Sequence, residues 1–493
     1  MPNTNTAEIS EIGFELFDRP REECGVLGIR YNERGHEAVL HGEIDPYQIA
    51  YTALVSQANR GRQNTGLASS VDGKFFDIVT GEGGPEKAFN DGEDLKKLPF
   101  APKYLVGHNR YTTVGGANGA QPVHFPTDFG DMVLAGNGEF SNHEDLSEEA
   151  RPYDWPSDYW MWGSRVADEI DGGFTLAGAM IRMASISEGA YSIAGMHDQN
   201  MVLMRDPHGV RPLFYGRIGE YGWASASETP TLEKVGVDIF DIREVPHGEV
   251  IVIDDKGPTS LKYAEAELAF CSMEKIYLSS ILDKRVRAER HGSGFIMAEE
   301  SPVEADLVLP IMGSALMAAA GFADALDIHL DIEAIAKKRG ASRNFMEYMK
   351  LMRDLKKNPK HILTIDHLED KRVVVVDDSV FRGDTLKGLL DPIIDVAAET
   401  HIRIASPRIT KTCDKGVAIK TPEELIFNQI SERAFVESLG TKKKVASYHH
   451  LSMGGLIKAY GRELCTDCFT DGLWPVKRPT MRSEALQMAN RPR

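Results

Sequence analysis

The cysteine at position 24 stands where a nucleophile could act. Cys24 follows the charged stretch "FDRPREE" and precedes the apolar run "GVLGI". A cysteine at the start of a chain can use its own α-amine as the base for acyl transfer, while backbone amides or an asparagine hold the developing oxyanion. Such chemistry requires removal of residues 1–23, because an amide nitrogen is not a base. The alternative is that Cys24 is one more structural thiol.

A second stretch, "RVVVVDDSVFRGDTLKGLL" at residues 372–390, has the residue types of a phosphate site. Four consecutive valines predict a strand that is buried on both faces. Asp377 and Asp378 end that strand, and a loop from Ser379 to Thr385 leads into a predicted helix. Ligands of open α/β sheets bind at the carboxyl ends of the strands, where helix N-termini and backbone amides hold phosphate. Paired carboxylates suit sugar hydroxyls or a hydrated Mg²⁺. The plainer alternative is an acidic helix cap.

The other four cysteines are Cys271, Cys413, Cys465 and Cys468. The last two form a C-x₂-C pair, a spacing that redox, zinc and iron–sulfur sites all use. Together with the two distant cysteines, this pair makes a set that fits a tetrahedral zinc ion or a 4Fe–4S cluster. The alternative is four unrelated buried thiols.

The size and composition of the chain limit the classes of protein it can belong to. With 493 residues it exceeds what one hydrophobic core usually serves, so two domains are expected. Its formal charge of −18 argues against non-specific nucleic-acid binding. The cysteines are too few for a disulfide scaffold, and residues 1–23 do not resemble a secretory signal. The longest uncharged run, Leu307 to Ala323, contains Pro310 and Gly313 and predicts strand, loop and helix, not a membrane span. We therefore expect a cytoplasmic enzyme.

Two kinds of secondary-structure pattern follow one another along the chain. In the first half, short apolar runs such as "EVIVIDD" and "MVLAGNGEF" are bounded by turn residues. They predict layered, mostly antiparallel sheets, with helices near residues 46–58 and 164–185. In the second half, "ADLVLPIMGS" and "KRVVVVDDSV" each lead through a small-residue loop into a helical pattern, as in a parallel sheet. The change near residues 255–270 marks the expected boundary.

Several of these motifs carry a family resemblance. "DDSVFRGDT" resembles the phosphoribosyl pyrophosphate motif of the glutamine amidophosphoribosyltransferases, a type I phosphoribosyltransferase family. The segments "CSMEKIY", "RITKTCDKGVAI" and "ELCTDCF" are similar to the cysteine-bearing segments of the cluster-containing members. "EECGVLGI", "GHNRYTT", "AGNGEFSN" and "PSD" resemble motifs of the class II glutamine amidotransferases, whose nucleophile is N-terminal. The resemblance spans roughly residues 22–476.

The resemblance implies a fold of mixed α/β and α+β class with two domains. The first is a four-layer αββα domain of the N-terminal-nucleophile hydrolase type, and the second is a phosphoribosyltransferase domain with a parallel sheet. The implied division is a propeptide at residues 1–23, a glutaminase domain at 24–262, a phosphoribosyltransferase domain with the cluster ligands at 263–476 and a tail at 477–493.

The resemblance also implies roles for single residues. Cys24 is the implied nucleophile, Asn137 and Gly138 the oxyanion hole, Arg110 the partner of the glutamine α-carboxylate and Asp158 that of its α-amine. The residues implied to bind phosphoribosyl pyrophosphate are Ser314, Lys337, Arg343, Asp377, Asp378, Ser379, Arg382, Gly383, Asp384 and Thr385. Mg²⁺ is expected near Ser314, Asp377 and Asp378. Cys271, Cys413, Cys465 and Cys468 are the implied ligands of a 4Fe–4S cluster.

The implied activity makes 5-phosphoribosylamine, glutamate and pyrophosphate from glutamine, water and phosphoribosyl pyrophosphate, the first step of de novo purine synthesis. Family membership further implies purine nucleotides as feedback inhibitors and a homodimer or homotetramer. No nucleic-acid or membrane partner is expected.

The chain departs from the family pattern at four places, and three of them lie in the second half and its coupling loop. "NRGRQNTG" replaces "HRGQEGAG"; Gly313 replaces the acid of the pyrophosphate loop; Gly340 and its neighbours alter the mobile loop; and Asp384 stands where threonine is usual. These changes bear on acceptor chemistry and feedback more than on glutamine hydrolysis. Two alternatives therefore stay open: an amidotransferase that delivers ammonia to another phosphorylated acceptor, and a non-catalytic regulatory paralogue.

Overall fold

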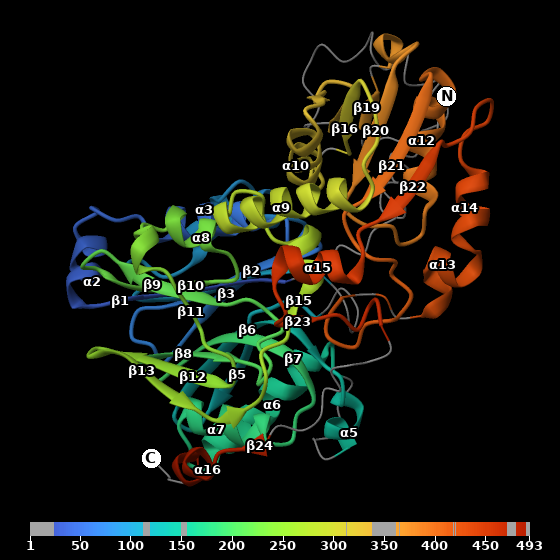
Figure 1. Ribbon diagram of the computed structural model, residues 1–493. Helices are drawn as coiled ribbons and strands as arrows, with labels where there is room; N and C mark the ends of the chain where they lie inside the picture. Colours follow the sequence, from blue (N-terminus) through green and yellow to red (C-terminus); the bar gives the residue numbers. More distant parts are fainter. Residues whose placement is uncertain are drawn as a thin grey trace, which may run out of the picture.

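The computed structural model has two parts, a pair of stacked sheets and a separate parallel sheet (Figure 1). The structure describes residues 24–111, 119–148, 155–311, 313–337, 361–363, 365–417, 419, 421–470 and 480–489. The expected propeptide, Arg343 and Gly340 lie outside these residues.

Two antiparallel sheets form the first part. The seven-stranded sheet has the order β11-β9-β10-β1-β4-β2-β3. Its strands are β1 (Gly25–Tyr31), β2 (Asn64–Ser70), β3 (Asp77–Glu82), β4 (Tyr104–Arg110), β9 (Phe214–Ile218), β10 (Gly222–Ala226) and β11 (Arg243–Glu244). The six-stranded sheet has the order β13-β12-β8-β7-β6-β5. Its strands are β5 (Val123–Thr127), β6 (Gly130–Phe140), β7 (Gly189–His197), β8 (Asn200–Arg205), β12 (Glu249–Asp254) and β13 (Gly257–Lys262).

Helices cover the outer faces of both sheets, which confirms the expected αββα layers (Figure 1). The seven-stranded sheet is covered by α3 (Pro46–Ser56) and α8 (Thr229–Lys234), and the six-stranded sheet by α6 (Asp158–Asp171) and α7 (Leu176–Ala184). The helix predicted near residues 46–58 is confirmed, and the segment predicted around 164–185 is helical but forms two helices, not one. That segment belongs to α6 and α7, because glycines at the end of α6 interrupt the helical path. The shorter helices are α2 (Glu33–Leu40), α4 (Pro85–Ala88), η1 (Glu93–Lys97), α5 (His143–Glu148) and η2 (Ile239–Asp241).

Strand β1 is apolar throughout because both of its faces are covered. Val26 points into the core between the two sheets, whereas Leu27 and Ile29 belong to the core beneath α3 and α8. All seven residues of β1 are buried. A strand in the middle of four layers therefore carries the continuous apolar run that is more typical of parallel sheets.

The second part is built on a parallel sheet of order β17-β16-β20-β21-β22. Its strands are β16 (Leu307–Pro310), β17 (His329–Leu330), β20 (Arg372–Asp377), β21 (Glu399–Ile404) and β22 (Ser447–His450), and its main helices are α9 (Lys284–Glu300), α10 (Leu316–Leu326) and α12 (Asp384–Val396). The four valines of β20 point alternately into the core with α9 and α10 and into the core with α12. The predicted strand buried on both faces is confirmed. So is the strand, loop and helix expected between Leu307 and Ala323.

Three short strand pairs complete the fold. β15 (Phe270–Cys271) pairs in parallel with β23 (Leu464–Cys465). β14 (Ala264–Glu265) pairs antiparallel with β24 (Thr480–Met481), and β18 (Ile335–Lys337) antiparallel with β19 (His361–Leu363). The remaining elements are η3 (Glu274–Leu278), η4 (Asp366–Leu368), η5 (Pro422–Glu424), α13 (Ile426–Gln429), α14 (Glu432–Ser438), α15 (Met453–Tyr460) and α16 (Ser483–Ala489). Helix α16 returns to the first part and packs on α7, with Ala485 fully buried. Within the described residues, no helix has the length and apolar character needed to span a membrane.

Candidate active sites

Cys24 lies where the two stacked sheets meet. It directly precedes β1, and the pairing of Gly25 with Asn109 places it beside the end of β4. Its backbone N–H donates to Oδ1 of Asn137 on β6 of the other sheet, at 3.2 Å. Its thiol donates to the carbonyl oxygen of Tyr111, at 3.6 Å. The candidate nucleophile and the candidate oxyanion-hole asparagine are therefore in direct contact.

The Cys24 thiol is held in its neutral form. Burial raises its pKa to about 11, although the Arg110 guanidinium partly opposes this shift. At neutral pH almost none of the nucleophilic thiolate is therefore present, and attack on a carboxamide needs a base within reach. An α-amine at Cys24 itself, with an ordinary pKa of about 7.7–8.0, would meet that need.

Asn137 offers an unused hydrogen-bond donor to this site. Its Oδ1 accepts from Cys24, but its Nδ2 is buried and has no partner among the described residues. A buried donor without a partner is costly, so it is satisfied when an oxyanion forms beside it. The next residue, Gly138, has φ +121°, and a Cβ there would lie 1.9 Å from the carbonyl oxygen of Ala190. Only glycine fits this position.

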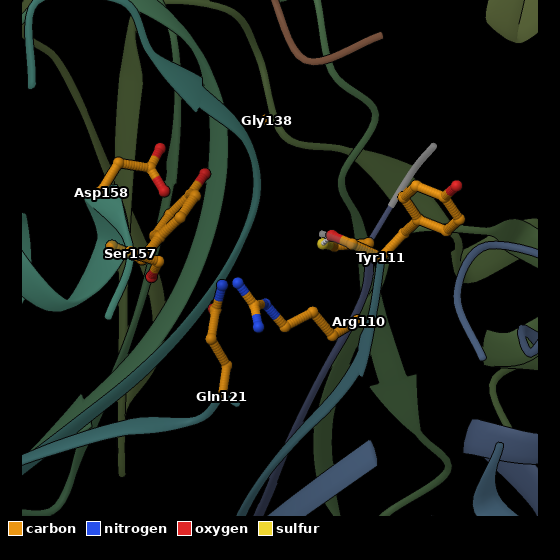
Figure 2. Close-up of a pocket in the computed structure, with 8 residues that line it drawn as sticks. Arg110, Tyr111, Gln121, Gly138, Ser157 and Asp158 are labelled. Atoms are coloured by element: carbon orange, nitrogen blue, oxygen red, sulfur yellow. Dashed lines mark hydrogen bonds between the residues drawn. The ribbon is translucent and has the colours of Figure 1, made fainter. Parts of the chain in front are cut away.

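A pocket opens beside the nucleophile (Figure 2). Its lining residues are Cys24, Arg110, Tyr111, Gln121, Gly138, Ser157, Asp158 and Tyr159. Arg110 enters the pocket from the end of β4 and Asp158 from the start of α6, and Figure 2 shows their charged ends converging on the same space. All five residues predicted for the glutaminase site are thus brought together.

Arg110 and Asp158 give the pocket one buried cation and one titratable carboxyl group. Both side chains belong to residues that are 3% exposed. Asp158 Oδ2 accepts a hydrogen bond from the backbone N–H of Phe140 at 3.1 Å. Burial, with a smaller contribution from Glu139, raises the pKa of Asp158 to about 6. A guanidinium and a carboxylate facing one pocket complement the carboxylate and ammonium of a free amino acid.

Sequence reasoning missed four residues that line this pocket: Tyr111, Gln121, Ser157 and Tyr159. The hydroxyl groups of Ser157 and Tyr159 are buried without partners among the described residues. Gln121 Oε1 accepts the backbone N–H of Gly136 at 2.8 Å, next to the oxyanion-hole residues. Ser157 and Tyr159 flank Asp158 in the sequence, so their position next to a predicted site residue could have identified them. Gln121 had no such signal, because only the fold brings it to β6.

The carboxyl edge of the parallel sheet gathers four of the predicted phosphoribosyl residues. β16 and β20 are adjacent and parallel, so the residues that follow them meet at one edge. Ser314 donates its hydroxyl hydrogen to Asp378 Oδ2, and Ser379 donates to Asp378 Oδ1 at 2.8 Å. Asp377 Oδ1 accepts the backbone N–H of Asp378 at 2.8 Å. Ser314, Asp378 and Ser379 are thus hydrogen-bonded to one another through their side chains.

The loop after β20 leads into α12 through Gly383, which has φ +84°. Asp384 and Thr385 begin that helix, and Lys337 ends β18; the side chains of these three residues lie outside what the structure describes. Arg382 forms an ion pair with Glu424. The guanidinium predicted to bind phosphate therefore has a carboxylate partner within its own domain.

The four remaining cysteines lie around one junction. Cys271 and Cys465 face each other in the β15–β23 pair. Burial raises the pKa of the Cys468 thiol well above its ordinary value, and the charges of Cys413, Cys465 and Cys271 raise it further, so all three lie nearby. No disulfide joins any of the five cysteines, all of which are described. Among the described residues, no three Cys, His, Asp or Glu side chains are placed to hold a single metal ion.

A buried ionic network joins Cys24 to the second part of the molecule. Arg60 Nε donates to the carbonyl oxygen of Cys24 at 3.1 Å. The same guanidinium pairs with Glu228 at 3.0 Å and with Glu274 of η3 at 2.8 Å. Arg211 approaches Glu274 at 3.8 Å. These four charged side chains are at most 3% exposed, and the network alternates in sign, as burial of charge requires.

Comparison with known proteins agrees with this two-site arrangement. A family profile described as a glutamine amidotransferase domain matches residues 86–245, and one described as a phosphoribosyl transferase domain matches residues 279–430. The amidophosphoribosyltransferase of Bacillus subtilis is 32% identical over 476 residues, which cover 92% of this chain and 94% of that protein. The chloroplastic amidophosphoribosyltransferase 1 of Arabidopsis thaliana is 32% identical over 93% of this chain and 80% of its own length. The solved B. subtilis glutamine phosphoribosylpyrophosphate amidotransferase, complexed with ADP and GMP, superimposes with a TM-score of 0.79 at 31% identity, covering 93% of this chain and 98% of that one.

A glutamine amidotransferase domain joined to a phosphoribosyltransferase domain defines a class of enzymes that splits glutamine at one site and uses phosphoribosyl chemistry at the other. Within that class, the chain belongs to the amidophosphoribosyltransferase family, the enzymes of the first step of purine biosynthesis. The match extends over both domains and nearly the full length. The comparisons therefore favour the expected reaction over another acceptor or a purely regulatory role.

Proposed function

We propose that Cys24, once it is the first residue of the chain, hydrolyses glutamine for the synthesis of 5-phosphoribosylamine. The observation that carries this proposal is the contact between Cys24 and Asn137, which leaves Asn137 Nδ2 as an unpaired donor beside the thiol. The α-amine takes the thiol proton, and the sulfur attacks the side-chain carboxamide of glutamine. Asn137 Nδ2 and the Gly138 N–H stabilise the resulting oxyanion. Ammonia leaves, and water then attacks the thioester and releases glutamate.

Arg110 and Asp158 orient glutamine for this attack. Arg110 binds the α-carboxylate and Asp158 the α-ammonium, so the substrate carboxamide is directed to the sulfur. The convergence of the two side chains on the pocket beside Cys24 supports these roles. Recognition of both charged groups restricts the site to a free amino acid, since a peptide-linked glutamine has neither group.

In the second site, ammonia displaces pyrophosphate from C1 of the sugar. A C–N bond forms while the C1–O bond breaks, pyrophosphate leaves with the electron pair, and the nitrogen loses a proton. Asp377 and Asp378 accept hydrogen bonds from the ribose hydroxyls, and the loop from Ser379 to Thr385, with Arg382 and Gly383, binds the 5′-phosphate. Ser314, Lys337 and Arg343 bind the pyrophosphate group. Mg²⁺ near Ser314, Asp377 and Asp378 would neutralise phosphate charge, a role that the two buried carboxylates suit.

We assign the four cysteines at the β15–β23 junction to a 4Fe–4S cluster, to which each would supply one thiolate ligand. Cys271 and Cys465 are paired across β15 and β23, and Cys271, Cys413 and Cys468 belong to or pack against one apolar core. Iron and acid-labile sulfide analysis of protein purified without oxygen tests this assignment; zinc without sulfide would contradict it.

The domain limits and partners complete the proposal. The first sheet pair ends with β13 at Lys262, which supports a glutaminase domain at 24–262 and a phosphoribosyltransferase domain at 263–476. A solved relative is complexed with ADP and GMP, which supports purine nucleotides as feedback inhibitors here. A homodimer or homotetramer in the cytoplasm remains our proposal for the assembly and its location.

The test of the reaction is the substitution Cys24→Ala, measured with two nitrogen sources. Glutamine-dependent synthesis of 5-phosphoribosylamine should fall to background, because the nucleophile is lost. Ammonia-dependent synthesis should remain, because the second site is unchanged. The mass of the active protein should lack residues 1–23. Persisting glutamine-dependent turnover would disprove the role of Cys24.

A further inference from the structure

A loop of the second domain reaches into the glutaminase site. This loop, residues 413–417, begins at Cys413 and contains Gly416, whose φ is +98°. A Cβ at Gly416 would lie 3.0 Å from the Cα of Gly138 and 2.9 Å from Arg211 Nη2. The absence of a side chain at position 416 therefore allows the loop to lie directly against the backbone of the oxyanion hole.

Arg211 holds this loop in place. Its Nε and Nη2 both donate to the carbonyl oxygen of Lys415, at 2.9 and 2.5 Å. Arg211 is fully buried and also lies 3.8 Å from Glu274, so its guanidinium has little freedom to move. Lys415 Nζ pairs with Asp414 at 2.6 Å and with Asp467 at 3.0 Å, and the second contact ties the loop to the C-x₂-C segment.

Gly138 is therefore enclosed by backbone from two domains. On β7 the carbonyl oxygen of Ala190 leaves no room for a Cβ at position 138. Gly416 provides the second backbone neighbour. Val417 and Ala190 belong to the same apolar core, which continues across the domain junction. Both neighbours of Gly138 are backbone atoms, which cannot move aside as a flexible side chain can. A shift of the 413–417 loop would therefore move Gly138 as well.

We propose that Lys415 and Gly416 are positioning residues that set the oxyanion hole of the glutaminase from the second domain. The inference rests on the proposed roles of Asn137 and Gly138. The loop binds no substrate; it acts by fixing where the Gly138 N–H points when the tetrahedral oxyanion forms. The loop therefore affects only the tetrahedral states in which an oxyanion occupies the oxyanion hole. Glutamine binding through Arg110 and Asp158 does not depend on the loop.

The test compares Gly416→Ala with Gly461→Ala in the full-length enzyme. Gly461 has a nearly equal φ of +95° but no atom within 4 Å of its Cβ position, so it controls for backbone strain alone. Two inhibitors are measured. L-Glutamate γ-semialdehyde adds the Cys24 thiol and places a tetrahedral oxyanion in the oxyanion hole. L-Glutamate occupies the same pocket with a planar carboxylate and forms no tetrahedral oxyanion.

We expect Gly416→Ala to weaken semialdehyde binding by about tenfold or more, since oxyanion-hole donors act mainly on states that resemble the transition state. L-Glutamate binding and ammonia-dependent synthesis should stay unchanged, and Gly461→Ala should alter none of these quantities. If Gly416→Ala does not fold, Arg211→Lys serves instead, because it loses one of the two hydrogen bonds to Lys415. It should show the same selectivity.

Two results would overturn the inference. One is unchanged semialdehyde binding in Gly416→Ala, and the other is an equal loss for both inhibitors, which would indicate general damage. Asn137→Ala, measured in parallel, separates these outcomes from failure of the proposed site. If Asn137→Ala loses semialdehyde affinity while Gly416→Ala does not, only the positioning role is wrong. If Asn137→Ala loses none, the oxyanion-hole assignment itself is wrong.

Discussion

The two active sites of this enzyme differ in how their polar groups are hydrogen-bonded within the protein. In the glutaminase pocket, Asn137 Nδ2 and the hydroxyls of Ser157 and Tyr159 are buried without partners among the described residues. At the carboxyl edge of the parallel sheet, Asp378 already accepts hydrogen bonds from Ser314 and Ser379. The first site therefore has hydrogen-bond donors without partners in the protein. In the second site, Asp378 must give up hydrogen bonds to Ser314 and Ser379 to bind substrate.

This difference has an energetic consequence. A buried donor without a partner gains nearly the full strength of a hydrogen bond when substrate supplies an acceptor. A group that gives up one partner for another gains only the difference between the two bonds. Single substitutions should therefore cost more in the glutaminase pocket than in the phosphoribosyl site.

The largest effect is expected for Asn137→Ala. Loss of one oxyanion-hole donor should lower kcat for glutamine hydrolysis by about 10²–10³-fold with little change in KM, because the donor acts on the transition state. Steady-state glutaminase assays measure this, and ammonia-dependent synthesis should be unaffected.

Asn142→Ala is the matched control for Asn137→Ala. Asn142 is also a buried asparagine beyond β6, but both of its amide atoms are bonded: Oδ1 accepts from the Glu188 N–H at 2.8 Å, and Nδ2 donates to the Ile186 carbonyl at 2.9 Å. This variant should lower the melting temperature and leave kcat unchanged. Equal kcat losses in the two variants would remove the distinction between unused and occupied donors.

The second effect concerns Asp158 and pH. Because burial raises its pKa to about 6, the carboxylate that we propose binds the α-ammonium is present above that pH and is lost as the pH falls through it. The KM for glutamine should therefore rise about tenfold per unit below this value. Asp158→Asn should raise KM by about tenfold to a hundredfold at pH 8, the range of a charge-assisted hydrogen bond, and should abolish the pH step.

Glutaramic acid, which is glutamine without the α-amine, provides the control for this pH dependence. Wild type and Asp158→Asn should hydrolyse it at similar rates, with no step near the pKa of Asp158. A step that persists with glutaramic acid would show that another group controls the pH dependence.

The smallest effect is expected for Ser314→Ala. Its hydroxyl bonds to Asp378 before substrate binds, so its loss should raise the KM for phosphoribosyl pyrophosphate only about twofold to tenfold. Both nitrogen sources should be affected alike, and Ser314→Thr, which keeps the hydroxyl, should restore KM. A loss of a hundredfold or more would show that the hydroxyl of Ser314 matters as much to this site as the Asn137 donor does to the first.

Local patterns predicted a large part of this molecule. The four valines of β20 indicated a strand with two buried faces, and the residues after it indicated a ligand edge, because side-chain burial and helix starts depend on short stretches of chain. The segment predicted as a helix around 164–185 is helical, but glycines after Asp171 divide it between α6 and α7. A periodic apolar pattern indicates which residues are buried, but it does not show whether those residues belong to one helix or to two.

The pocket was predictable only in part. Arg110, Asn137 and Asp158 could be found because each lies in a short motif with a recognisable neighbourhood. Gln121 could not be found, because its contact with Gly136 joins residues whose only connection is the packing of the chain near β6. The pairing of Arg382 with Glu424 was equally invisible, since the two residues lie in separate elements of the second domain.

By itself, the sequence determined the kinds of chemistry available to this protein: a cysteine before an apolar strand, paired carboxylates after another, and four further cysteines. These depend on residue type and on local backbone geometry, which a few neighbouring residues specify. The packing of distant segments leaves one donor of Asn137 unused beside Cys24 and places Gly416 of the second domain against Gly138. Such contacts depend on how whole elements pack, and close packing of distant segments is not encoded in any single stretch of the chain.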